Sequence, residues 1–160
     1  MEALASLENS AVAQFILGYT WAFYGLLAVH AFGMAGVVGG SIMLSLRVLG
    51  FAVGVPVAGF EFLKRVAAWS FVANAGSGIL LYFTNAKALT VLWTFQIKMA
   101  SILLGGILLW VLWRQISPYK ADADHRYDGK AKAVAAATIF FWIAAIVSGR
   151  YIAYTLPVGF

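Results

Sequence analysis

The stretch WAFYGLLAVHAFGMAGVVGGSIMLSL, residues 21–46, decides the fold class of this chain. It contains no Asp, Glu, Lys or Arg. A helix of this length is sufficient to cross a hydrocarbon core of about 30 Å. Arg47 and Gly50 then end the apolar run. The sequence therefore predicts a first transmembrane helix over about residues 21–46, with one ionisable side chain, His30, inside it.

Three further apolar stretches follow, at about residues 66–83, 92–113 and 134–154. Hydrophobic residues make up 63% of the chain and charged residues only 11%, whereas a soluble domain carries roughly 25% charged residues. No Pro- or Ser-rich linker separates the stretches. We therefore predict one domain over residues 1–160, an all-α bundle of four transmembrane helices in contact with the lipid bilayer.

The segments around the spans are short or polar. Ser10 is the predicted N-cap of a short interfacial helix over residues 11–18. Residues 50–59 are a predicted loop, because they are rich in Gly and contain a proline. Residues 84–89 are a predicted polar turn, and residues 114–132 are the longest hydrophilic segment.

The positions of Lys and Arg predict the orientation, because these residues concentrate in short cytoplasmic loops. The N-terminal tail carries Glu2 and Glu8 but no basic residue, so it does not resemble a signal peptide. The loop after the second span has only Lys87. The other two loops carry most of the positive charge: Arg47, Lys64, Arg65, Arg114, Lys120, Arg126, Lys130 and Lys132. Both termini are therefore expected outside, which is the periplasm for a bacterial inner membrane.

Several function classes can be set aside from composition. The chain has no cysteine, which excludes disulfides and thiolate-ligated metal sites. The net charge of +5 follows the predicted membrane topology, so no nucleic-acid partner is expected. Asp122, Asp124, His125 and Asp128 alternate with basic residues. We interpret them as a solvated loop and not as a metal cluster.

Four polar residues in the apolar spans are the candidate site. Ionisable residues inside a membrane are rare and usually mark function. Counted at about 1.5 Å per residue from the inner ends of their spans, four side chains reach one layer in the outer third of the bundle: His30, Lys98, Arg150 and Tyr82. A structural interpretation stays open, since Lys98 and Arg150 can extend toward the interface and His30 can simply bond a neighbouring helix.

Three chemistries suit this layer. His30 can ligate the iron of a b-type haem, with Lys98 and Arg150 on the propionates and Tyr82 or Tyr151 hydrogen-bonding nearby. The two cations can alternatively hold an anionic or quinone head group. A copper site is the third, because imidazole and thioether ligands suit Cu(I); its residues would be His30, Met34 and Met43.

The histidine count limits the haem interpretation. His125 belongs to the predicted inner loop, so His30 is the single membrane histidine. A haem held by two histidines of one protomer is therefore excluded. The glycines at positions 33, 36 and 40 leave room either for another helix or for a flat cofactor. A cofactor-free subunit of a larger complex, with the polar layer joining its helices, is the remaining alternative.

Short motifs in the four spans carry a resemblance to known proteins. They are HAFG at residues 30–33, GILLYF at 78–83, FQIK at 95–98 and SGRYIAY at 148–154. With these motifs the chain resembles an uncharacterised family of short bacterial four-helix inner-membrane proteins. More distantly, His30 and Lys98 resemble a pair in the four-helix bacterial protoporphyrinogen oxidases. The general layout is similar to the membrane domain of copper-resistance protein D.

The resemblance to the oxidases implies a haem or porphyrin ligand, with His30 on the iron and Lys98 on a propionate or substrate. Together with the polar layer, it leads us to expect a haem-binding electron-transfer protein. The cofactor would lie in the outer half of the bundle and exchange electrons with a quinone or a periplasmic partner. The Gly-rich, aromatic outward face predicts a homo-oligomer or a subunit of a larger complex.

Overall fold

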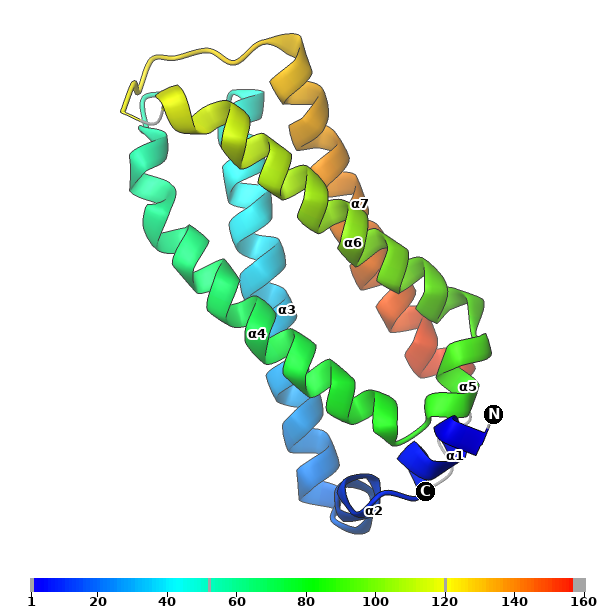
Figure 1. The fold of residues 1–160 in the computed structure, drawn as a ribbon. Coiled ribbons are helices and arrows are strands. Elements are labelled where there is room, and N and C mark those ends of the chain that lie inside the picture. Colours follow the sequence, from blue (N-terminus) through cyan, green and yellow to red (C-terminus); the bar gives the residue numbers. More distant parts are fainter. Residues whose placement is uncertain (1, 52, 120, 157–160) are drawn as a thin grey trace.

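The computed structural model describes residues 2–51, 53–119 and 121–156, and these ranges contain helices and no strand. Four long helices form the bundle (Figure 1), which confirms the predicted all-α, four-helix transmembrane fold. The elements in chain order are α1 Glu2–Glu8, α2 Ala11–Gly18, α3 Thr20–Leu49, the 3₁₀ turn η1 Val57–Phe60, α4 Glu61–Phe83, α5 Ala86–Val91, α6 Trp93–Ile116, the 3₁₀ turn η2 Ser117–Tyr119 and α7 Gly129–Thr155.

The helix boundaries follow from local chemistry. Gly50 ends α3 in the left-handed conformation, with φ 105°, and its N–H donates to the carbonyls of Leu46 and Arg47. Asp128 caps α7 by accepting from the N–H of Ala131 at 2.8 Å. The helix α4 begins before the predicted residue 66, because its charged first turn stays helical from Glu61 onward.

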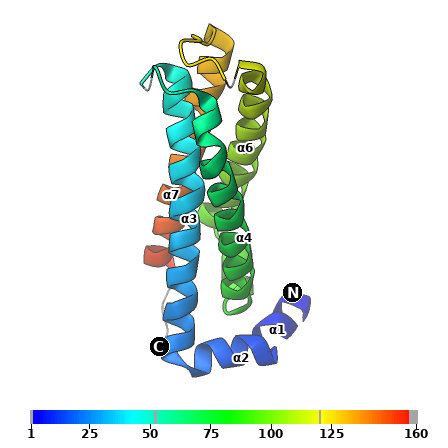
Figure 2. The same ribbon diagram turned by 90° about the vertical axis from the view of Figure 1, so that its left-hand side faces the viewer.

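The long helices pack as two antiparallel pairs. The helix α3 lies along α4, α6 lies along α7, and α3 also contacts α7, which joins the pairs (Figures 1 and 2). Small residues set the close approach. A Cβ added to Gly33 would lie only 2.8 Å from the main-chain N of Asn74 and the main-chain O of Ser70. The backbones of α3 and α4 are therefore in direct contact at this level.

One end of the bundle, which we call the basic end, holds the two long loops and the main hydrophobic cluster. Arg47 is buried there, although it carries a charge. Its Nε donates to the carbonyl of Val55 at 2.6 Å, and its Nη2 donates to the carbonyl of Ala123 at 2.7 Å. The surrounding cluster comprises Leu44, Val48, Val57, Phe60, Leu112, Ile116, Tyr127, Ala131 and Ala135.

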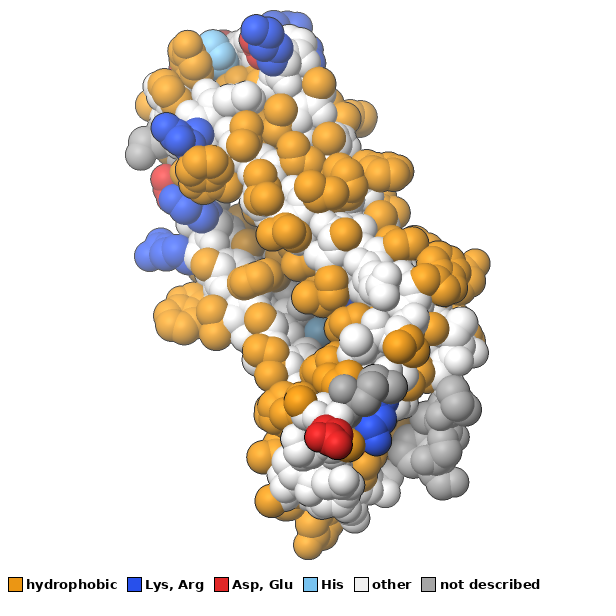
Figure 3. Space-filling model, turned by 45° about the vertical axis from the view of Figure 1, so that its right-hand side comes forward, with side chains coloured by type: hydrophobic (Ala, Val, Ile, Leu, Met, Phe, Trp, Pro, Cys, Tyr) orange, Lys and Arg blue, Asp and Glu red, His pale blue; other side chains and the backbone are white. Residues whose placement is uncertain are grey.

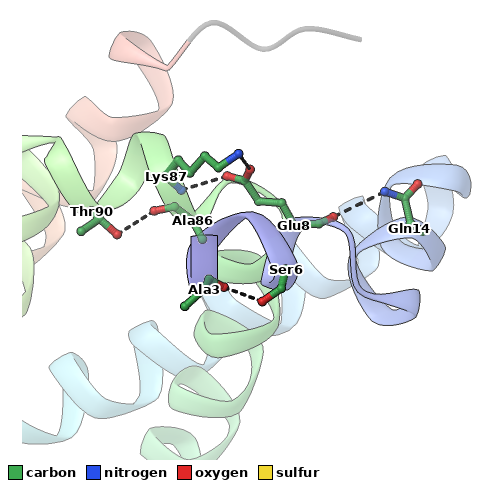
Figure 4. A network of polar contacts seen from close by, with 7 residues as sticks. All are labelled: Ala3, Ser6, Glu8, Gln14, Ala86, Lys87 and Thr90. Atoms are coloured by element: carbon green, nitrogen blue, oxygen red, sulfur yellow. Dashed lines mark hydrogen bonds and ion pairs between the residues drawn. The ribbon is translucent and has the colours of Figure 1, made fainter. Parts of the chain in front are cut away.

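The opposite end, which we call the capped end, is crossed by the short helices α1 and α2 (Figure 2). The predicted cap of α2 is present, because the Oγ of Ser10 accepts from the N–H of Ala13 at 3.3 Å. The predicted turn at residues 84–89 is wrong in part, since α5 is helical from Ala86. The helix begins there with support from a distant residue, Glu8. One carboxylate oxygen of Glu8 accepts from the main-chain N–H of Lys87 at 2.8 Å, and the other lies 3.4 Å from the Nζ of Lys87 (Figure 4).

The sides of the bundle are apolar. Hydrophobic side chains cover most of the face shown in Figure 3, and Lys and Arg gather mainly toward one end. In the most apolar window of each long helix, only 11–33% of the residues are buried inside the protein. Lipid accounts for this exposed apolar surface, because a soluble monomer rarely leaves so large a patch uncovered. The chain is therefore a multi-pass membrane protein.

Candidate functional site

The structure brings two of the predicted residues together. His30 lies on α3 and Lys98 lies on α6, 68 positions later in the chain. The Nζ of Lys98 is 3.2 Å from the Nε2 of His30, which is hydrogen-bond distance. Both side chains are half-buried. We call these two residues the His–Lys pair.

The other nitrogen of His30 faces α4. Its Nδ1 lies 3.0 Å from the main-chain carbonyl oxygen of Asn74 and 3.2 Å from the Oγ of Ser77. In return, the side-chain amide of Asn74 donates to the main-chain carbonyl of His30 at 2.7 Å. Asn74 and Ser77 are both buried. Sequence reasoning missed them as site residues, although two polar residues three positions apart in an apolar span were a usable signal.

Two glycines give the pair its space. A Cβ added to Gly78 on α4 would lie 3.0 Å from the Cε1 of His30, which is too close without a shift. A Cβ added to Gly149 on α7 would lie 3.5–3.6 Å from the end of the Lys98 side chain, which is ordinary contact. All four long helices therefore contribute to the surroundings of the pair.

The pair has no acidic counter-charge in the spans. The six Asp and Glu residues of the chain are Glu2, Glu8, Glu61, Asp122, Asp124 and Asp128, and all lie at helix ends or in a loop. An ionised group in an apolar environment is costly unless it is paired and hydrogen-bonded. The ammonium of Lys98 is thus set to bind an anion, which this chain does not supply from its spans.

Tyr82 lies one turn beyond Gly78, toward the capped end. Its hydroxyl is 2.6 Å from the Oγ1 of Thr90, and its ring stacks on Phe95 with centroids 5.7 Å apart. These contacts join α4 to the segment that leads into α6. Tyr82 therefore lies on the capped side of the pair and forms its hydrogen bond with Thr90, not with His30 or Lys98.

Arg150 and Tyr151 are not brought to the pair. Both are exposed on α7, where the guanidinium of Arg150 lies 5.4 Å from the ring centroid of Tyr154. The neighbouring Ser148 is buried and Gly149 touches Lys98. Because successive helical residues are rotated by about 100°, positions 150 and 151 turn away from that inward face. The sequence analysis counted only the distance of Arg150 along the helix and did not predict this direction.

The methionines do not form a cluster with His30. Met34 is half-buried and packs against the cluster of Val37, Val38 and Trp142. Met43 is 50% exposed and lies 13 positions, roughly 20 Å, along α3 from His30. Within the described ranges, no group of three or more His, Cys, Asp or Glu residues could hold a metal ion.

The second histidine, His125, lies in the loop before α7 and has a different environment. The ring of His125 stacks on Tyr119, with centroids 3.9 Å apart and planes at 7°, and meets Tyr127 edge-on. This ring stack belongs to the basic end, where Tyr127 packs in the main hydrophobic cluster. Comparisons with protein-family models, curated proteins and solved structures gave no match. The chemistry of the site therefore rests on its own geometry.

Proposed function

We propose that this protein binds a b-type haem through His30, in the half of the bundle nearer the capped end, and that it transfers electrons. The observation that carries the proposal is the His–Lys pair in spans without acidic residues. It combines an imidazole, which is a common iron ligand, with a cation that lacks an anionic partner.

The donor set fits a haem in its chemistry. The iron needs a nitrogen ligand, and the two propionates need positive or hydrogen-bonding partners. The Nε2 of His30 supplies the first and the Nζ of Lys98 the second, once the two atoms separate from their 3.2 Å contact. When bound, the haem supplies one-electron redox chemistry. Tyr82 and Phe95 contribute an aromatic wall on the capped side.

We place the protein in the bacterial inner membrane, with the capped end in the periplasm. The support is the charge distribution, because seven Lys and Arg residues of the described ranges lie at or near the basic end and one, Lys87, lies in the segment after α4. The resemblance to the porphyrin-handling oxidases agrees with this placement. A quinone or periplasmic redox partner and a homo-oligomeric state stay predictions of the sequence.

One other function has a specific observation in its favour. Both ring nitrogens of His30 already have hydrogen-bonding partners inside the bundle. The His–Lys pair can therefore act as a polar tie between helices in a cofactor-free subunit. A copper site has less support, since Met43 is remote from His30 and exposed.

The test is the visible absorption spectrum of the detergent-purified protein, oxidised and then reduced with dithionite, after expression with ample haem. We expect a Soret band with α and β bands on reduction, and complete loss of these bands in His30→Ala. His125→Ala is the matched control and should keep them, because it changes the only other histidine. A colourless wild-type protein that remains folded would reject the haem proposal in favour of the polar tie.

A further inference from the structure

The hydrogen-bond partners of His30 determine which nitrogen carries its proton. The main-chain oxygen of Asn74, 3.0 Å from Nδ1, can only accept. The hydroxyl of Ser77, 3.2 Å from Nδ1, donates its own hydrogen to the carbonyl of Ala73 at 2.6 Å, so it too acts as an acceptor toward His30. The two acceptors, at 3.0 and 3.2 Å, lie closer to Nδ1 than the one donor that faces it, the side-chain amide of Asn74 at 3.4 Å, which places the proton on that nitrogen.

The opposite side of the ring has the complementary partner. In its charged form the Nζ of Lys98 is an ammonium, which has three donors and no acceptor. At 3.2 Å from Nε2 it requires a lone pair on that nitrogen. A proton on Nε2 would bring two donors face to face. The network thus assigns neutral His30, with hydrogen on Nδ1 and the lone pair of Nε2 directed at α6.

Asn74 holds this arrangement from the backbone. Its side-chain amide donates to the carbonyl of His30 at 2.7 Å, while its own carbonyl accepts from the ring of His30. The two residues are therefore bonded to each other reciprocally, across helices whose backbones already touch at Gly33. Rotation of either side chain breaks one of these bonds, and a shift of α3 along α4 breaks both. The remaining contact, Asn74 Nδ2 to His30 Nδ1, is longer at 3.4 Å.

We propose that Asn74 is a positioning residue, which with Ser77 holds His30 in the Nδ1–H tautomer and presents the Nε2 lone pair as the ligand atom. Lys98 is then a reversible occupant of that lone pair. A metal and the ammonium cannot use the lone pair together, so ligation by His30 is coupled to departure of Lys98. The ligand role of Nε2 rests on the proposed function, whereas the tautomer does not.

The tautomer can be read directly without any cofactor. The chain has two histidines, so a His125→Gln background leaves one imidazole. We would label that histidine with ¹⁵N and record its nitrogen resonances in haem-free protein in lipid bilayers. The expected result is one species with a protonated Nδ1 and an unprotonated Nε2. A protonated Nε2 in this parent protein overturns the proposal.

Variants then assign the cause. We expect Ser77→Ala, which removes one of the two acceptors at Nδ1, to lower the ratio of the two tautomers by roughly threefold, the effect of losing one hydrogen bond of ordinary strength. Asn74→Leu keeps its main-chain carbonyl but loses the side-chain bond to the carbonyl of His30, and we expect a decrease of similar size because the ring is no longer held against its acceptors. Ser148→Ala is the matched control, because Ser148 is also buried and bonds the carbonyl four residues earlier. Lys98→Met should move the Nε2 resonance and leave that of Nδ1 in place.

The outcomes separate the two proposals. If Asn74→Leu and Ser77→Ala leave the tautomer ratio equal to that of Ser148→Ala, the positioning role is rejected. If Asn74→Leu does not fold, Ser77→Ala and the parent protein still decide the question. A protein with the expected tautomer but no Soret band keeps the positioning role and rejects haem binding. A protein that binds haem but carries the proton on Nε2 in its haem-free form keeps the haem proposal and rejects the positioning role.

Discussion

Each end of the bundle encloses a basic side chain, and the two are held in different ways. Arg47, at the basic end, is 1% exposed and donates to two main-chain carbonyls, those of Val55 and Ala123. Its guanidinium also lies 5.7 Å from the ring centroid of Tyr127. Lys98, in the other half, has a hydrogen bond only to the side chain of His30 among the contacts of the described residues.

This difference indicates that Arg47 stabilises the fold, whereas Lys98 is available to bind a ligand. Main-chain carbonyls are fixed by the fold, so Arg47 ties the loop after α3 to the loop before α7. A single side-chain partner can be exchanged, and Lys98 has a flexible stem of four carbons. The comparison therefore predicts that loss of Arg47 damages stability, whereas loss of Lys98 damages ligand binding.

The largest effect on stability is expected for Arg47→Met. The substitution leaves two carbonyl groups in part-buried hydrogen bonds without their donor, and each such loss costs about 1–2 kcal/mol. We expect a decrease of roughly 3 kcal/mol in the free energy of unfolding, measured by denaturant titration in detergent micelles. Arg65→Met is the control, because Arg65 is an exposed arginine at the same end. Equal stabilities of the two variants would contradict a structural role for Arg47.

Lys98→Met is expected to leave stability within about 1 kcal/mol of wild type, because removal of a costly buried charge offsets one lost hydrogen bond. Haem retention should fall by roughly tenfold, the value of one charge-assisted bond of about 1.4 kcal/mol. Haem transfer to apomyoglobin measures it. Destabilisation as large as that of Arg47→Met would remove the distinction between the two cations.

A smaller effect is expected from the two glycines beside the pair. Gly78→Ala places a methyl group 3.0 Å from the imidazole of His30 and should cost about 1–2 kcal/mol of stability through overpacking. Gly149→Ala meets Lys98 at 3.5 Å and should be neutral, or stabilising by up to about 1 kcal/mol as a helical Gly-to-Ala change. Thermal unfolding followed by circular dichroism compares them. A larger loss of stability in Gly149→Ala than in Gly78→Ala would show that Lys98, and not His30, is the more tightly packed side chain.

The smallest effect is expected for the exposed face of α7. Arg150→Leu and Tyr151→Phe alter side chains that point away from His30. We expect unchanged haem content and stability within about 0.5 kcal/mol, as for most surface substitutions. Haem content per protein, from the pyridine haemochromogen spectrum, is the measurement. Loss of haem in Arg150→Leu would mean that its guanidinium turns inward, and that Lys98 shares its role with a second cation.

The fold could be predicted because membrane helices are long and apolar, and each of the four gives a continuous signal. The depth of His30 and Lys98 was also predictable, since helical rise is constant. Direction around the helix was not predicted, and Arg150 shows why. The direction of Arg150 around the axis of α7 depends on the neighbours that Ser148 and Gly149 contact, and those neighbours lie on other helices.

Local sequence patterns also failed to predict structure that depends on contacts with distant segments. The helix α5 owes its first turn to Glu8, which lies 79 residues before Lys87. Asn74 lies beside His30 because the glycines of α3 let α4 approach closely. The sequence of either span alone does not show which helices pair. Patterns within single spans therefore do not predict residues whose roles depend on contacts between two helices.

The close contact at Gly33 has a mechanical consequence. Because the backbones of α3 and α4 touch there and Asn74 bonds across them, we expect these two helices to move together at this level. Lys98 belongs to the other pair, α6 and α7, which is tied to His30 by one side-chain bond. Any opening between the two nitrogens therefore proceeds by motion of the lysine side chain or of the α6–α7 pair, with His30 as the fixed reference point.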